Sequence, residues 1–323
     1  MITRLEDAIE FGSFRKMPVA AQDLESVSCD LFVSAYNVTD RVNRVFAGVD
    51  AAAKHWVVHS EYGFADHELP GTGSIFRPVG DEVEFWMDYL SDPRLDGSID
   101  ARNIVVDITG MLRPHVLSLL RVFQTRGVRT LRVLYSEPAR YLKAEKTQFS
   151  TGAVTEVRQV LGFEGSHDLS GVDGDVLIIG TGYDESLMRH VADRYPRARK
   201  FQMFGLPSLQ PQMYQENHLR AHGASESMGA ASDRYWLFAP ASDPYATAAV
   251  VQDAVLREAG DPSFRNLYLA PLGTKAQVLG FGLYYLYACS NSPVSAVLPL
   301  SGGYTQESSV GLSRLWVYEF DLP

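Results

Sequence analysis

The chain has 323 residues, of which 46% are hydrophobic and 21% are charged, and it carries a formal net charge of -10. This length and ordinary globular composition predict two domains, while the acidic balance excludes a broad nucleic-acid-binding surface, which needs clustered Lys and Arg. The only cysteines of the chain are Cys29 and Cys289, and no apolar run is long enough to span a bilayer. We therefore expect a cytoplasmic protein without a disulfide framework or a membrane contact.

Strands alternate with helices along the chain, which predicts an α/β fold of βαβ units with mostly parallel sheets. In the first half, apolar runs predict strands at residues 31–36, 55–60, 103–106 and 130–135, with helices starting near 42, 82 and 113. In the second half they predict strands at 175–179, 200–204, 266–270 and 295–298, with helices near 187–191 and 245–259 and an apolar helix after 275.

The four strands of each half follow one another in the same order and at closely matched spacing, apart from the middle connection. This repetition predicts two Rossmann-like halves related by an internal pseudo-twofold duplication, at residues 1–162 and 163–323. The glycine-rich polar stretch at 162–174 is the expected boundary. The alternative is that any α/β protein repeats at about the length of one βαβ unit.

Small, hydroxyl-bearing and glycine residues follow the predicted strands of both halves. In parallel sheets these turns line the ligand crevice, where backbone N–H groups and helix N-termini can hold a phosphate or a ribose. The candidate ligand-binding residues are Ser34, Asn37, Asp107, Thr109 and Gly110 in the first half, and Gly180, Thr181, Gly182, Gly273, Thr274 and Lys275 in the second.

Structural roles compete with ligand binding at several of these positions. Asp107 is more commonly the cap of a turn than a base or a ribose contact, Gly273 fits a strand-to-helix turn, and Thr274 fits a helix N-cap. Lys275 is harder to explain in this way, because a cation at a helix start opposes the macrodipole unless an anion lies nearby. We predict that Asp107, Thr109, Thr274 and Lys275 face one cleft.

Known cofactor motifs are incomplete in this sequence. Gly180 and Gly182 lack the third glycine of a dinucleotide fingerprint, and Gly273 to Lys275 lack the first glycine of a P-loop, so neither an NAD site nor a P-loop ATPase is supported. The histidines at 55, 59 and 67 have no further ligand at metal-binding spacing, so no metal site is supported either. Glu61 and Glu137 both follow predicted strands, which keeps a paired-carboxylate site conceivable.

The turns Asp107-Ile-Thr-Gly110 and Gly273-Thr-Lys275 together resemble two partial copies of the D-x-T-G-G-T-K turn of CRISPR-associated Rossmann-fold (CARF) domains. The resemblance implies a nucleotide-binding protein that senses a cyclic oligonucleotide, as a sensor or accessory subunit in a prokaryotic antiviral defence system, with a protein partner or a second copy. The alternative is a two-Rossmann-domain enzyme, a transferase or a hydrolase, that acts on a nucleotide or a nucleotide-sugar.

Overall fold

A computed structural model describes residues 8–95, 99–100, 102–141, 150–167, 173–228, 235–289, 292–306 and 309–323. The chain forms two compact units. We call Phe14–Thr151 together with Gly303–Pro323 the N unit, and the remainder, which includes residues 8–13 and 152–302, the C unit. The sequence places one boundary at 162/163, whereas the chain passes between the units near residues 13, 151 and 302.

The N unit contains a seven-stranded sheet in which five neighbouring strands are parallel. β13 lies antiparallel to β6 on one side and to β1 on the other. In sheet order the strands are β1 (Arg15–Val19), β13 (Ser309–Asp321), β6 (Thr130–Tyr141), β5 (Ile104–Asp107), β2 (Ser28–Ala35), β3 (Asp50–Val57) and β4 (Ser74–Phe76).

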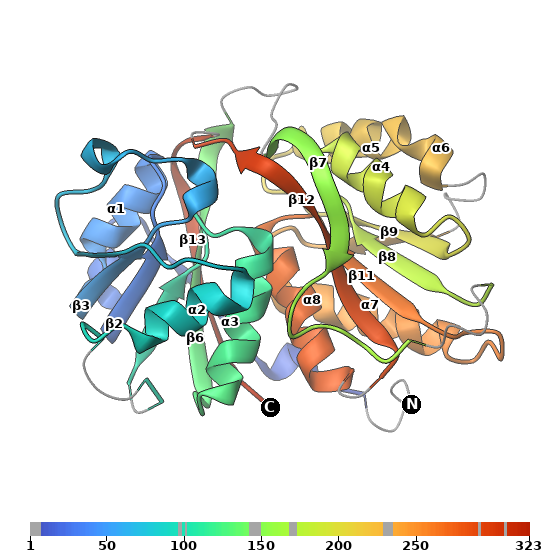
Figure 1. Ribbon diagram of the computed structural model, residues 1–323, viewed down its shortest axis with the longest axis horizontal. Helices are drawn as coiled ribbons and strands as arrows, with labels where there is room; N and C mark the ends of the chain where they lie inside the picture. The colour runs from blue at the N-terminus through green and yellow to red at the C-terminus, as the bar shows by residue number, and fades with distance from the viewer. Residues whose placement is uncertain are drawn as a thin grey trace. The chain divides into compact units, whose positions relative to one another are not determined.

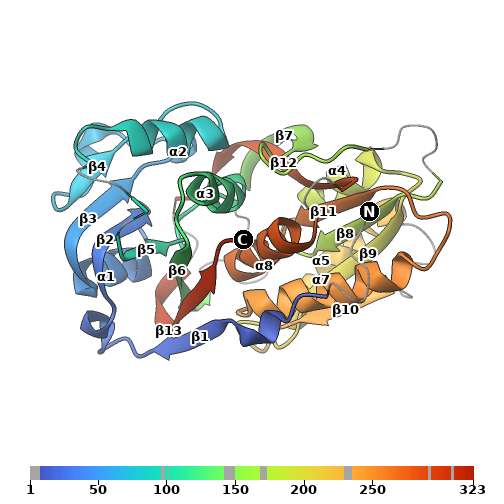
Figure 2. The same ribbon diagram turned by 90° about the horizontal axis from the view of Figure 1, so that it is seen from below.

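Helices cover both faces of this sheet, with α1 (Asp40–Gly48) on one face and α2 (Glu82–Ser91) and α3 (Arg113–Thr125) on the other (Figures 1 and 2). Short 3-10 turns, η3 (Leu24–Ser26), η4 (Ser60–Tyr62) and η5 (Asp66–Glu68), lie in the connections. Under α1, the rings of Phe46 and Trp56 stack at 3.6 Å. On the other face the Trp86 Nε1–H donates to the carbonyl of His115 at 2.9 Å, which joins α2 to α3.

Local sequence signals account for these elements. Val105 and Val106 lie in a strand that is buried throughout, as expected for a central strand covered on both faces. The Asp81 side chain caps α2 by accepting the N–H groups of Val83 and Glu84. Pro114 occupies the first turn of α3, where its missing N–H leaves no hydrogen bond unmade.

The C unit contains a six-stranded sheet, with α4 (Glu185–Arg194), α5 (Met213–Gly223) and α6 (Ser225–Met228) on one face and α7 (Pro244–Glu258) and α8 (Lys275–Ala288) on the other (Figure 1). In sheet order the strands are β10 (Trp236–Ala239), β9 (Arg199–Gly205), β8 (Val176–Gly180), β11 (Leu267–Pro271), β12 (Val294–Tyr304) and β7 (Ser150–Gln159). The first five of these strands are parallel.

The same strand order occurs in both units, which confirms two Rossmann-like α/β halves. In each, the third, second, first, fourth and fifth parallel strands follow one another across the sheet, as β4-β3-β2-β5-β6 and as β10-β9-β8-β11-β12. The predicted first strands of the two halves therefore occupy equivalent central positions. The third strands, β4 and β10, lie in passages for which no strand was predicted.

Next to its five parallel strands, each unit contains one strand that follows the fifth parallel strand of the other unit in the chain. β7 follows β6 in the chain but lies beside β12 in the C unit, and β13 follows β12 but lies beside β6 in the N unit. The N-terminal segment also changes unit, because η2 (Phe11–Ser13) packs in the C unit just before β1 enters the N unit. This exchange explains why a single boundary along the sequence does not separate the units.

No helix in the described ranges is both long enough and apolar enough to cross a bilayer.

Both cysteines are free and buried, Cys29 in β2 and Cys289 at the end of α8. Burial raises the pKa of the Cys29 thiol to about 11 and that of the Cys289 thiol to about 12. Because the thiolate is the reactive form, we expect neither thiol of the folded protein to react with Ellman's reagent at mildly alkaline pH, and both to react in concentrated guanidinium chloride. Rapid modification of the folded protein would contradict this burial.

Candidate functional site

The carboxyl ends of β2 and β5 form the topological switch point of the N unit. These two strands are neighbours in the sheet, but the helices that follow them, α1 and α3, lie on opposite faces. The two loops therefore diverge, and in open α/β sheets this divergence is where ligands bind. The polar residues Ser34, Arg41, Asp107, Thr109 and Ser136 meet here, and together with Thr39 at the start of α1 we call them the carboxyl-edge cluster.

Asp107 is the fully buried centre of this cluster. Its Oδ2 accepts the Ser34 hydroxyl at 3.0 Å, and its Oδ1 accepts the Thr109 N–H at 2.9 Å. Thr109 continues the network, since its hydroxyl lies 3.0 Å from the Ser136 hydroxyl and accepts the Ser136 N–H at 3.0 Å. Asp107 therefore closes a turn and ties the ends of β2, β5 and β6 together, which is the structural alternative considered for this residue.

The same kind of turn ends β2. The Asn37 Oδ1 accepts the Thr39 N–H at 3.0 Å, as the Asp107 Oδ1 accepts that of Thr109. Gly110 lies against this turn, because a Cβ at its position would come within 2.3 Å of the Ala35 carbonyl oxygen. Only glycine permits so close an approach of the two loops. Sequence reasoning thus selected residues that the fold brings together.

Two polar atoms at the start of α1 lack a hydrogen-bond partner among the described residues. They are the Thr39 Oγ1 and the Arg41 Nε, on side chains that are 3% and 8% exposed. Thr39 is the N-cap of α1, yet its hydroxyl caps none of the helix N–H groups. The Arg41 guanidinium donates through Nη1 to the carbonyl of Ser136, so it reaches from α1 to the end of β6.

Burial and charge have opposite effects on the pKa of Asp107. Burial raises the pKa of Asp107, and the hydrogen bonds from Thr109 and Ser34 and the charge of Arg41 oppose this rise. Burial also raises the pKa of Tyr62, whose hydroxyl donates to the Gly110 carbonyl at 3.0 Å. The phenol of Tyr62 is therefore neutral at physiological pH and acts as a hydrogen-bond donor.

In the C unit, residues of the equivalent turns form hydrogen bonds that join elements of the fold. The Thr181 hydroxyl follows Gly180 at the end of β8 and donates to the Met203 carbonyl at 2.8 Å, which joins β8 to β9. Gly182 permits a close approach like that of Gly110, since a Cβ there would come within 2.3 Å of the Leu272 carbonyl oxygen. These residues meet at the switch point between β8 and β11.

Thr274 is the N-cap of α8, as the structural alternative predicted. Its hydroxyl accepts the Gln277 N–H at 3.2 Å, and the Gln277 side chain accepts the Thr274 N–H at 3.2 Å, which completes a capping box. Gly273 accommodates this box, because a Cβ there would lie 2.3 Å from the Gln277 Oε1. Lys275 is the first residue of α8 and is partly buried. Its role as a phosphate contact stays a prediction.

Five of the predicted residues therefore lie in the N unit and six lie in the C unit. The cleft predicted for Asp107, Thr109, Thr274 and Lys275 joins residues of both units and stays a prediction. Arg41, Thr39 and Ser136 were not among the candidate ligand-binding residues selected from the sequence. The one signal for Arg41 was a cation in the first turn of a helix, the same feature that singled out Lys275.

Glu61 and Glu137 lie in different environments. Glu61 is exposed on η4, whereas Glu137 is buried in β6 and its Oε1 accepts the Trp316 Nε1–H at 2.6 Å. The indole thus engages the Glu137 carboxylate from β13, inside the N-unit sheet. A catalytic pairing of the two carboxylates stays a prediction.

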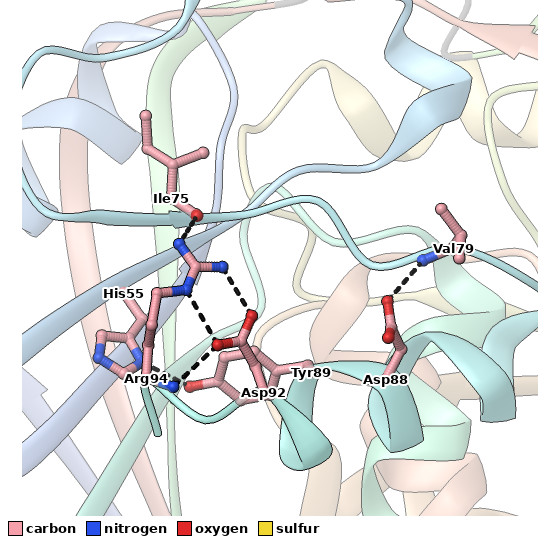
Figure 3. Close-up of polar contacts among 7 residues, drawn as sticks. All are labelled: His55, Ile75, Val79, Asp88, Tyr89, Asp92 and Arg94. Atoms are coloured by element: carbon pink, nitrogen blue, oxygen red, sulfur yellow. Dashed lines mark hydrogen bonds and ion pairs between the residues drawn. The ribbon is translucent and has the colours of Figure 1, made fainter. Parts of the chain in front are cut away.

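A second polar group lies at the end of α2, beside a cavity of about 300 Å³ (Figure 3). Arg94 lines this cavity and binds Asp92 through Nε at 2.9 Å and Nη2 at 2.7 Å, while its Nη1 donates to the Ile75 carbonyl at 2.9 Å. Beneath it the His55 Nδ1 lies 2.9 Å from the Tyr89 hydroxyl, and both side chains are buried. The hydrogen bonds from Arg94 lower the pKa of Asp92 to about 2, so this ion pair persists in acid.

No group of three or more acidic, histidine or cysteine side chains suited to a metal ion occurs within the described ranges. Comparisons with models of protein families, with curated proteins and with solved structures found no match for this chain.

Proposed function

We propose that the chain binds a small phosphate-bearing ligand of the nucleotide class at the carboxyl edge of the N unit, with a phosphate on the first turn of α1. The Arg41 guanidinium supplies the positive charge, and the Thr39 hydroxyl and the first N–H groups of α1 supply hydrogen bonds. The resemblance to CARF turns makes cyclic oligonucleotides the first ligands to test. Such a ligand would make the protein a sensor or accessory subunit in a prokaryotic antiviral defence system.

The observation that supports this proposal is the unmet hydrogen-bonding capacity at the start of α1. Buried polar atoms normally have partners, and leaving one without a partner costs about 1–3 kcal/mol. The Thr39 Oγ1 and the Arg41 Nε are two such atoms, next to the switch point where α/β sheets bind ligands. Both are closed off from solvent, so the turn between β2 and α1 has to open slightly as the phosphate enters.

Replacing Thr39 by Val tests the site, because it removes the hydroxyl and keeps the shape of the side chain. A thermal-shift screen of nucleotides, dinucleotides and cyclic oligonucleotides first identifies the ligand. We expect Thr39→Val to weaken its binding about tenfold, the loss of one charge-assisted hydrogen bond of roughly 1.5 kcal/mol. Without the ligand the variant should be as stable as the wild type or more stable, since no hydrogen bond within the described chain is lost.

Thr155→Val is the matched control, because Thr155 is an exposed threonine in β7 of the C unit. It should leave ligand affinity unchanged. Equal affinity of Thr39→Val and the wild type would exclude Thr39 as a ligand contact. Chromatography of the ligand after incubation then separates the two classes of function, because a sensor returns it unchanged, whereas a transferase or hydrolase consumes it.

A further inference from the structure

A cavity of about 740 Å³ lies at the opposite, amino edge of the N-unit sheet, where β5 and β6 begin and α3 has ended. We call it the amino-edge cavity. Its lining includes three arginines, Arg102, Arg129 and Arg132, against two carboxylates, Asp100 and Glu319. This excess of positive charge contrasts with the chain as a whole, which has 29 Lys and Arg against 39 Asp and Glu. The volume falls within the range typical of small-molecule sites.

Arg132 is held in place within β6. Its Nη2 donates to the Ser28 carbonyl and to the Asn103 Oδ1, both at 2.6 Å. Its Nε is buried and has no hydrogen-bond partner among the described residues. These contacts fix the guanidinium beside the cavity, so a ligand would not have to order a flexible side chain there.

Arg102 and Arg129 come from the chain just before β5 and just before β6. In the described part of the chain, neither guanidinium takes part in a hydrogen bond or an ion pair. Because β5 and β6 are adjacent parallel strands, their starts present these two side chains at the same sheet edge. A guanidinium offers a planar fork of donors that matches phosphate oxygens, and two forks that line one cavity suit a ligand with more than one anionic group.

From this geometry we propose that the amino-edge cavity is a second binding site, for a compact ligand that carries adjacent phosphate groups. Arg102 and Arg129 bind the phosphate oxygens, and Arg132 supports them from β6. The site is separate from the carboxyl-edge cluster, since the two lie at opposite ends of the parallel strands. A competing explanation is that these arginines only stabilise the negative C-terminal end of α3, which ends at Thr125.

Isothermal titration calorimetry with pyrophosphate tests the site in the full-length protein, at low ionic strength and with sodium chloride as the control titrant. We expect saturable binding that weakens as salt is added. Arg102→Gln and Arg129→Gln should each weaken it about tenfold, and the double variant should abolish it. Arg257→Gln is the matched control, because Arg257 is an exposed arginine on α7 of the C unit, and it should bind pyrophosphate like the wild type.

Three results would overturn the proposal. The first is the absence of saturable binding in the wild type. The second is binding that survives in the Arg102→Gln, Arg129→Gln double variant but is lost in Thr39→Val, because the anion then occupies the start of α1. The third is a lowered melting temperature of Arg129→Gln with unchanged pyrophosphate affinity, which would assign the arginine to the helix end alone.

Discussion

A chain that ends at residue 308, and so lacks β13, should lose the folded N unit while the C unit persists. β13 pairs with β6 from Ser309 opposite Tyr141 to Asp321 opposite Thr130, and its other edge pairs with β1. Without it, β1 has no neighbour in the sheet and β6 exposes a long unpaired edge.

The size of this loss follows from the side chains that β13 buries. Leu315, Val317, Tyr318 and Phe320 are all at most 2% exposed. At about 1.5–3 kcal/mol for each buried apolar side chain, they contribute roughly 6–12 kcal/mol. The net stability of a whole domain is about 5–15 kcal/mol, so the N unit should not remain folded without them.

Limited proteolysis with mass spectrometry measures this outcome for each unit separately. In the truncated chain we expect rapid cleavage within residues 15–141 and slow cleavage within 173–289. A chain that ends at Asp321 is the matched control, since it keeps β13 complete and should resist the protease like the wild type. Equal resistance of residues 15–141 in all three chains would show that β13 is not needed to hold the N unit together.

β13 was not predicted from the sequence, whereas the central strands of both sheets were. The central strands β2, β5, β8 and β11 were predictable because they are short apolar runs followed by turns and amphipathic helices, so the signal is local. β13 and β7 gain their stability from partners in the other half of the sequence, and the exchange leaves no local signal. The third strands β4 and β10 are too short to show a clear pattern of apolar residues.

In the candidate site, too, residues with a local sequence signal were predictable and residues placed by long-range contacts were not. Ser34, Asp107 and Thr109 were predictable because they lie at or just after the carboxyl ends of buried strands, and parallel strands end at one edge. Arg41 was not, because the apolar positions of α1 indicate only which face packs on the sheet, and a polar residue between them is expected to face solvent. Its contact with Ser136 depends on the distance from α1 to β6 across the sheet, which only the folded chain defines.

The stability of the folded protein should fall as the pH is lowered from about 6.5 to about 4, because of His55. Burial lowers the pKa of His55 to about 4, and the charges of Arg102 and Arg94 act in the same direction. Above pH 6.5 the imidazole is neutral in both the folded and the unfolded chain, so it has no effect. Between pH 6.5 and 4 the unfolded chain binds a proton that the folded chain excludes, and unfolding becomes easier.

The expected loss is roughly 3 kcal/mol by pH 4, because a difference of one pKa unit corresponds to about 1.4 kcal/mol. This is a substantial part of the stability of a typical domain. The pair of Asp92 and Arg94 above the imidazole does not oppose the loss in this range, since the Asp92 carboxylate remains ionised down to about pH 2.

Urea denaturation at a series of pH values measures this dependence, and His55→Gln isolates its cause. Glutamine does not titrate and can still form a hydrogen bond with the Tyr89 hydroxyl, so we expect the variant to lose about 3 kcal/mol less than the wild type between pH 6.5 and 4. His67→Gln is the matched control, because His67 is exposed, and it should follow the wild-type curve. If His55→Gln and the wild type lose the same stability over this range, the imidazole of His55 is not excluded from protonation in the folded protein, and its burial against Phe76 and Tyr89 does not control the acid sensitivity.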